Sequence, residues 1–249
     1  MKPKLGWIPD VPDHRDLMCA IAPPPLGLPP RVDLRGQCPP VYNQGQLGSC
    51  TANATGAAHQ FEQRQQAGAK NFAPSRLMIY YEARVALGQV DRDGGAYLRD
   101  CFKSIAKKGV CPESLWPYVP AKFAMKPPKE CYTEGKKHQA VKYQRVSIAE
   151  GAICAVLAAG NLVAFGAMLY QSFMAAWPSG KIPMPSKTER AVGGHAMALV
   201  GYDTARRIYI VRNSWGAGNA MKGYHEMPFD YIHDDNLTAD FWMVSRVEV

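Results

Sequence analysis

Patterns typical of helices are confined to the first part of this chain, whereas patterns typical of strands dominate the part after residue 160. From Cys50 onward, apolar side chains recur every three or four positions, and each run ends at a glycine. The expected helices cover residues 50–67, 75–87, 96–108 and 147–159, the last opened by the capping-box spacing of Ser147 and Glu150. Helices segregated from strands predict an α+β fold with two lobes and a site in the cleft between them.

Four strands are expected in the second half, at "LVAFGAML", "HAMALVGYD", "RIYIVRN" and "DFWMVSRVEV". These runs are rich in β-branched and aromatic residues and are separated by Gly and Asp. Residues 203–207 are expected to form a hairpin turn between the second and third runs. We therefore expect a mainly helical lobe over residues 29–140 and a mainly β lobe over residues 141–249.

The first 28 residues differ from the rest, because they contain the cluster "APPPLGLPP". Proline lacks a backbone donor and fixes its own φ, so this density of prolines predicts an extended arm instead of a helix or sheet. We expect the arm, residues 1–28, to pack on the surface and partly cover the cleft. The alternative is a loosely ordered tail that only adds stability.

Composition limits the possible partners. The net charge is +8, but the basic residues are spread as doublets without aromatic interleaving, so we expect no nucleic-acid partner. The most basic stretch, residues 122–145, leaves binding of a polyanion as an alternative. No apolar run is long enough to span a membrane, and none follows the lysines of "MKPKLGWIPD" as a signal peptide would require. A soluble monomer is expected, either secreted or cytoplasmic.

The seven cysteines include no C-x-x-C pair, which argues against a structural zinc site or a thioredoxin-type site. We expect neither a metal nor an organic cofactor. Besides Cys50, the cysteines are Cys19, Cys38, Cys101, Cys111, Cys131 and Cys154. Three disulfides with one free thiol would suit an oxidising compartment, and seven reduced thiols would suit the cytosol.

Cys50 stands at an expected helix start, where free N–H groups and the helix dipole favour a thiolate. A thiolate nucleophile also needs an imidazole partner. His195 suits this role, because the glycines in "VGGHAMALVGYD" clear space in front of its ring. Asn213 in "VRNSWG" could accept from the imidazole and fix its tautomer, with Trp215 shielding that bond. The Gln44 side chain and the Cys50 N–H would form an oxyanion hole.

These segments resemble the papain family of cysteine peptidases over most of residues 28–249. The resemblance rests on "PVYNQGQLGSC", "DGGAYLRDCFKSIAKKGVCPESLWPY", "GGHAMALVGYD" and "YIVRNSWGAGNAMKGY". It implies a papain-like fold whose helical lobe faces an antiparallel, β-barrel-like lobe across the active-site cleft. It also implies that Cys50 is the nucleophile, His195 its partner, Asn213 the orienting residue and Gln44 the oxyanion donor.

The resemblance extends to substrate binding. Gly94 and Gly95 would hydrogen-bond a substrate backbone laid out as a strand, since glycine lets two backbones approach closely. The main specificity pocket would take the side chain two residues before the scissile bond. Its walls would include the neighbourhood of Gly194 and the C-terminal strands.

Three departures from the family pattern stand out. Leu47 replaces a cysteine, so the disulfide that this cysteine makes in the family should be absent. Thr51 replaces the aromatic residue after the nucleophile. Asn219 and Ala220 replace a Trp-Gly pair, which should make the leaving-group side of the cleft less aromatic. Such deviations are typical of non-animal members and suggest a prokaryotic source.

The sequence therefore predicts a cysteine endopeptidase that cleaves proteins or peptides through a thioester acyl-enzyme. One alternative is an acyltransferase that delivers the same thioester to an amine. The other is a non-catalytic module on this scaffold that binds a polyanion or a protein.

Overall fold

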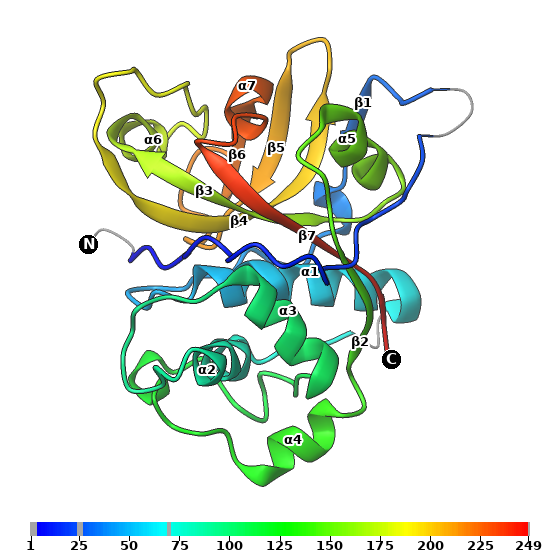
Figure 1. Cartoon of the computed structure of the whole chain (residues 1–249), viewed down its shortest axis with the longest axis vertical. Helices are drawn as coiled ribbons and strands as arrows, with labels where there is room; N and C mark the ends of the chain where they lie inside the picture. Colours follow the sequence, from blue (N-terminus) through cyan, green and yellow to red (C-terminus); the bar gives the residue numbers. More distant parts are fainter. Residues whose placement is uncertain (1–3, 24–26, 69–70, 249) are drawn as a thin grey trace.

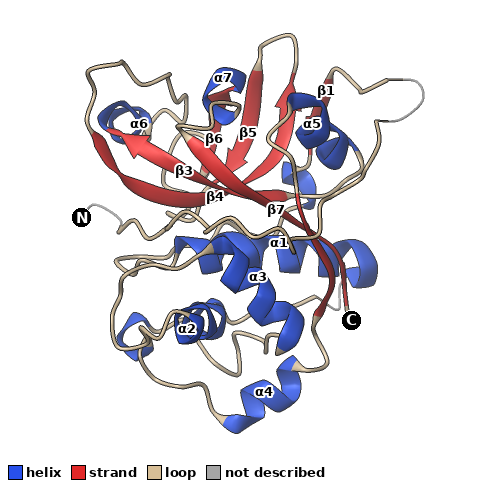
Figure 2. Ribbon diagram, in the orientation of Figure 1, coloured by secondary structure: helices blue, strands red, loops and turns tan. Residues whose placement is uncertain are grey.

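Helices and strands lie on opposite sides of the molecule in the computed structural model, which describes residues 4–23, 27–68 and 71–248 (Figures 1 and 2). The helical side is built from α1 (Cys50–Ala67), α2 (Arg76–Ala86), α3 (Leu98–Lys107) and α4 (Lys129–Gly135). The first three match the helices expected from the sequence to within two residues at each end. Ser75 caps α2 by accepting from the Met78 N–H at 3.2 Å.

The other side is one antiparallel sheet in the order β2-β7-β3-β4-β5-β6, with β1 paired to the end of β4. Its strands are β1 (Arg31–Asp33), β2 (Ala140–Arg145), β3 (Val163–Tyr170), β4 (Ala191–Asp203), β5 (Ile208–Arg212), β6 (Tyr224–Pro228) and β7 (Thr238–Val247). In the described part of the chain no pairing joins β2 to β6, so the sheet does not close into a barrel. The predicted α+β fold is confirmed. The lobe boundary at residue 140 stays a prediction.

Short helices accompany the sheet. They are α5 (Glu150–Ala158), α6 (Gln171–Ala176) and α7 (Phe229–Ile232), and two 3₁₀ turns, η1 (Arg35–Gln37) and η3 (Pro120–Lys122), lie in connections. The capping box expected for α5 is wrong, because the helix begins at Glu150 with Ala149 as its cap. The Ser147 hydroxyl instead accepts from the Ala149 N–H at 3.3 Å in the turn before the helix. Among the described helices, none has the length and apolar character needed to cross a membrane.

All four predicted strands form, and the hairpin turn lies where it was expected, between Asp203 and Ile208. β4 begins four residues before the expected run, at Ala191. Three strands, β1, β2 and β6, were missed. β1 has only three residues, and the sequences of β2 and β6, "AVKYQR" and "YHEMP", mix charged and apolar residues. Both are held by pairing with a neighbour instead of by their own pattern.

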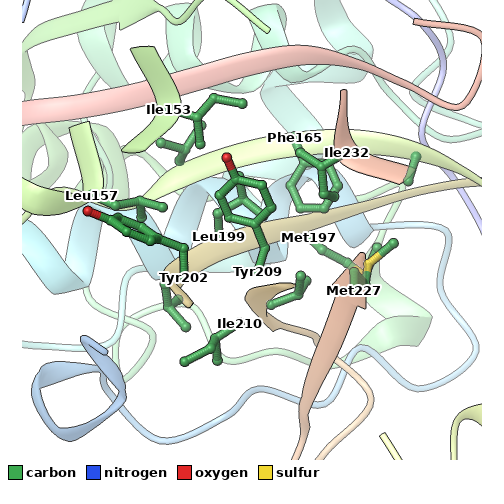
Figure 3. Close-up of a cluster of buried hydrophobic side chains, with 14 of the residues drawn as sticks. Ile153, Leu157, Phe165, Met197, Leu199, Tyr202, Tyr209, Ile210, Met227 and Ile232 are labelled. Atoms are coloured by element: carbon green, nitrogen blue, oxygen red, sulfur yellow. The ribbon is translucent and has the colours of Figure 1, made fainter. Parts of the chain in front are cut away.

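Two hydrophobic cores flank the junction between the helices and the sheet. The core on the sheet side fills the space among α5, β3, β4 and β5 (Figure 3). The side chains labelled there are Ile153, Leu157, Phe165, Met197, Leu199, Tyr202, Tyr209, Ile210, Met227 and Ile232. The second core lies around α1, α2 and α3 and includes Leu77, Tyr80, Phe102 and Trp242. Because α1 packs directly against β4, the start of the helix is held close to the middle of that strand.

The first described part of the arm is extended and runs between the sheet and helices α1 and α3, and the rest turns away along the sheet side toward β1 (Figure 1). Trp7 forms a parallel bridge with Ala96, and Met18 forms one with Arg145 at the end of β2. Residues 24–26 of the proline cluster lie outside the described residues. The extended conformation agrees with the proline-rich sequence.

Candidate active site

Cys50 is the first residue of α1, an 18-residue helix, and its side chain is fully buried. Burial raises the pKa of the Cys50 thiol to about 11, because removing water disfavours the thiolate. Backbone N–H groups of Ala196, Gly6 and Thr51 oppose this shift by favouring the anion. The thiol is therefore protonated at neutral pH in this arrangement, although its surroundings contain donors suited to a thiolate.

His195 lies on β4 opposite Ala167 of β3, and it is also fully buried. Its Nε2 is 2.7 Å from Oδ1 of Asn213, which directly follows β5. The Trp215 ring lies beside it, with the two ring centroids 4.7 Å apart. Burial lowers the pKa of His195 to about 4, although the bond to Asn213 acts in the opposite direction. Its Nδ1 has no hydrogen-bond partner within residues 4–23, 27–68 and 71–248.

Burial disfavours the charged forms of both Cys50 and His195, which lie on two elements that pack against each other. The backbone N–H of Ala196, the residue after His195, lies near enough to the Cys50 sulfur to favour the thiolate, which places this part of β4 beside Cys50. An ion pair of thiolate and imidazolium would need solvent or a substrate that compensates for burial.

The side-chain amide of Gln44, the expected oxyanion donor, is fully buried. Its Nε2 donates to the backbone carbonyl of Lys4 at 2.9 Å and to that of Leu47 at 3.0 Å. Because these two carbonyls can only accept, they fix which end of the amide faces the arm, and Oε1 accepts from the hydroxyl of Ser214 at 2.6 Å. Ser214 was missed by the sequence reasoning, although it lies in the same "NSWG" segment as Asn213. The Gln44 Nε2–H group that would bind the oxyanion is therefore already bonded to a peptide carbonyl of the arm, that of Lys4.

Of the glycines expected to bind substrate, two contact the arm. The Gly194 carbonyl accepts from the N–H groups of Gly6 and Trp7, both at 3.1 Å. A Cβ on Gly95 would lie 2.2 Å from the Gly6 carbonyl oxygen, so only glycine permits this approach. Gly94 is exposed, and its nearest neighbour would be the Gln89 side chain at 3.6 Å. The substrate-binding roles of these glycines stay predictions.

Trp7 fills a slot in the sheet wall that the sequence did not reveal. A Cβ on Gly166 of β3 would lie 1.9 Å from the Trp7 ring, and one on Gly194 would lie 2.8 Å from it. The indole N–H donates to Asp240 Oδ2 of β7 at 3.0 Å. The slot therefore has flat glycine walls and a carboxylate at its end.

A buried ionic cluster holds the arm beside this slot. Its members are Asp10, Asp16, Arg99, Arg145 and Asp240. Arg99 pairs with Asp16 at 2.6 Å and Arg145 with Asp240 at 3.0 Å, while Asp10 accepts from the Trp242 indole at 2.9 Å. Three carboxylates face two guanidinium groups, so one carboxylate lacks a full counter-charge. Burial and the nearby Asp240 raise the pKa of Asp10 to about 7.

The departures from the family pattern have local consequences. Leu47 is buried, and all seven cysteines, each within the described residues, are unbridged. The Thr51 hydroxyl is buried and has no partner within the described residues. Asn219 accepts from the Gly223 N–H at 2.6 Å and donates to the Tyr224 carbonyl at 2.8 Å, so a polar clamp replaces an aromatic side chain. The described residues contain no cluster suited to a metal ion.

Comparisons with known proteins identify the family of the chain. The model of the papain family of cysteine proteases matches residues 28–237. An uncharacterized peptidase C1-like protein of Acanthamoeba polyphaga mimivirus is 40% identical over 215 residues, which cover 82% of this chain and 69% of the viral protein. Chymopapain from Carica papaya is 28% identical over 206 residues, covering 79% of this chain and 54% of chymopapain.

A solved structure extends the similarity to the whole fold. Xylellain, a cysteine protease from Xylella fastidiosa, superposes with a TM-score of 0.91 at 39% identity, covering 96% of this chain and 95% of Xylellain. The family match covers well over half of the chain, and the viral relative exceeds 30% identity over most of it. The chain belongs to the papain family of cysteine proteases.

Proposed function

We propose that this papain-family protease is an endopeptidase that uses Cys50 and His195, and that its N-terminal arm holds it in an inactive state. The observation that carries the proposal is the Lys4 carbonyl, whose oxygen accepts from Gln44 Nε2 at 2.9 Å. A peptide carbonyl polarised by that donor is what acyl transfer requires of an oxyanion hole.

Catalysis would proceed once the arm leaves and water returns to the cleft. The thiolate of Cys50 attacks the substrate carbonyl carbon, and Gln44 with the Cys50 N–H stabilises the oxyanion. His195, held by Asn213, protonates the leaving amine and then activates a water molecule that hydrolyses the thioester.

The arm is bound in a way that protects it from this attack. The Gly6 N–H lies near enough to Cys50 to favour its thiolate, but it donates to the Gly194 carbonyl at 3.1 Å, so the backbone of the arm is anchored to β4 beside the nucleophile. The arm also excludes water, which leaves Cys50 and His195 neutral. Backbone bonds from Gly6 to Gly194 and Ala96 fix this unproductive register.

The slot that Trp7 occupies is the specificity pocket we assign to substrates. Its glycine walls suit a large flat side chain, and the Asp240 carboxylate suits a side chain with an N–H donor at its tip. We expect peptides with Trp in this pocket to be cleaved faster than matched peptides with Phe. Equal rates would show that the carboxylate plays no part in selection.

The proposal is tested with Gly6→Ala in the full chain. The new Cβ would lie 1.9 Å from the Gly48 carbonyl oxygen, so the arm must move away from Cys50. We expect Gly6→Ala to cleave peptide substrates and to be labelled by an epoxide inhibitor of cysteine peptidases at least tenfold faster than the unaltered chain. The effect should disappear when Cys50→Ala is added.

Gly151→Ala is the matched control, because nothing lies within 4 Å of the Cβ it would add. It should behave like the unaltered chain. If Gly6→Ala exposes Cys50 to the inhibitor but cleaves no peptide, the arm is a cover but the chain is not a peptidase. If neither rate changes, the arm does not inhibit.

A further inference from the structure

The side-chain amide of Asn213 is fixed by three hydrogen bonds. Its Oδ1 accepts from His195 Nε2 at 2.7 Å and from the Ser214 N–H at 2.7 Å. Its Nδ2 donates to Nε2 of His225 at 2.8 Å. Because a backbone N–H can only donate, the bond from Ser214 settles which end of the amide is oxygen. The sequence identified Asn213 but gave no reason to notice His225.

His225 reaches this position through the register of the sheet. It lies on β6 opposite Val211 of β5, and Asn213 follows Val211 by two residues. Side chains alternate along a strand, so Val211 and Asn213 point to the same face as His225. The imidazole is fully buried, and its ring lies 5.4 Å from that of Phe173 on α6.

We infer that His225 is a positioning residue for catalysis, which holds the Asn213 amide in the one orientation that presents an acceptor to His195. This inference rests on the proposed function of His195. Without an acceptor at residue 225, only the Ser214 N–H would oppose a half-turn of the amide that presents its N–H groups to His195. Two donors would then face each other, and the imidazole would lose the Nε2–H tautomer that leaves Nδ1 free for the Cys50 proton.

His225 suits this role because it stays neutral. Burial, together with the nearby His195, lowers the pKa of His225 to about 3, so its Nε2 remains an acceptor at any pH where the enzyme works. Stability alone does not explain the residue. Its Nδ1 has no partner in the described part of the chain, and a buried polar atom left unpaired is destabilising.

The test compares His225→Leu with His225→Gln, both in the Gly6→Ala chain. Leucine removes the acceptor, whereas the glutamine carbonyl can replace Nε2. We expect His225→Leu to lower kcat about tenfold or more with little change in KM, and to shift the acid limb of the kcat/KM pH profile. His225→Gln should restore most of kcat. In an Asn213→Ala background, His225→Leu should have no further effect on kcat, because there is no amide left to orient.

A second measurement does not depend on peptidase activity. The ¹⁵N shifts of His195 should report the Nε2–H tautomer in the parent and in His225→Gln, and a mixture of tautomers in His225→Leu. If Gly6→Ala cleaves no peptide, the proposed function fails, while the ¹⁵N result still decides the role of His225. If His225→Leu lowers the unfolding temperature but leaves the tautomer, the pH profile and the Asn213→Ala cycle unchanged, His225 is only structural and the inference is overturned.

Discussion

The arm has two segments that differ in how they bind the rest of the protein. The inner segment, residues 4–10, buries Trp7 and Asp10 and contacts both walls of the cleft. The outer segment, residues 11–23, is held by backbone bonds of Leu17 and Cys19 to Arg145 and by the Asp16 carboxylate. Three of its apolar side chains, Val11, Leu17 and Met18, are exposed, and Leu17 is 70% exposed. Under the proposed function, the inner segment blocks the site and the outer segment tethers the inner one.

The largest effect is expected when one apolar side chain of each segment is truncated, Trp7 in the inner segment and Leu17 in the outer segment. Trp7→Ala removes a buried aromatic side chain, which costs about 3–5 kcal/mol in a packed site. If that free energy holds the arm in place, Trp7→Ala should raise the rate of Cys50 labelling by roughly a hundredfold or more. Leu17→Ala should leave it unchanged. Equal effects of the two truncations would contradict the division into segments.

The pH dependence of arm binding tests the inner segment further, because Asp10 of that segment and His195 in the site both have shifted pKa values. The pKa of Asp10 is raised to about 7 when the arm is bound, so this carboxyl favours the bound arm at low pH, and its contribution is lost as the pH rises through 7. The pKa of His195 is lowered to about 4, so His195 opposes the bound arm as the pH falls below about 6.5. Between pH 4 and 6.5, the contributions of Asp10 and His195 to the free energy of arm binding change with pH in opposite directions, so they cancel.

Asp10→Asn should unmask the contribution of His195. The bound arm of the unaltered chain should keep nearly constant stability from about pH 4.5 to 6.5, whereas in Asp10→Asn it should weaken about tenfold for each unit of acidification. The population of the bound arm can be followed by the indole N–H resonance of Trp7. Identical pH slopes in the two proteins would show that Asp10 does not take up a proton on binding.

The smallest effect is expected in the outer segment. Arg15 pairs with Asp13 within the same segment, and its side chain is 76% exposed. Exposed ion pairs contribute little because water screens them. Arg15→Ala should change neither the unfolding temperature nor the labelling rate of Cys50. A clear rise in labelling would mean that the outer segment does more than tether the arm.

Prediction from sequence worked best where one residue and its neighbours carry the signal. The start of α1 at Cys50 and the strand after Gly194 follow from local periodicity and from glycines, so these elements were found. The three hydrogen bonds of Asn213 could not be found in this way. They depend on the register of β6 with β5, which places His225 opposite Val211. The residue pattern of "YHEMP" does not predict this register.

The sequence by itself determined the α+β fold, its helices and main strands, and the motif residues that meet in one site, because apolar periodicity and turn residues act over short distances. Only the tertiary structure decided that the arm enters the cleft, that Trp7 meets Asp240, and that His225 meets Asn213. These contacts join residues that are distant in sequence or on separate strands. Their free energy comes from packing and burial, which exist only after the sheet and α1 have assembled.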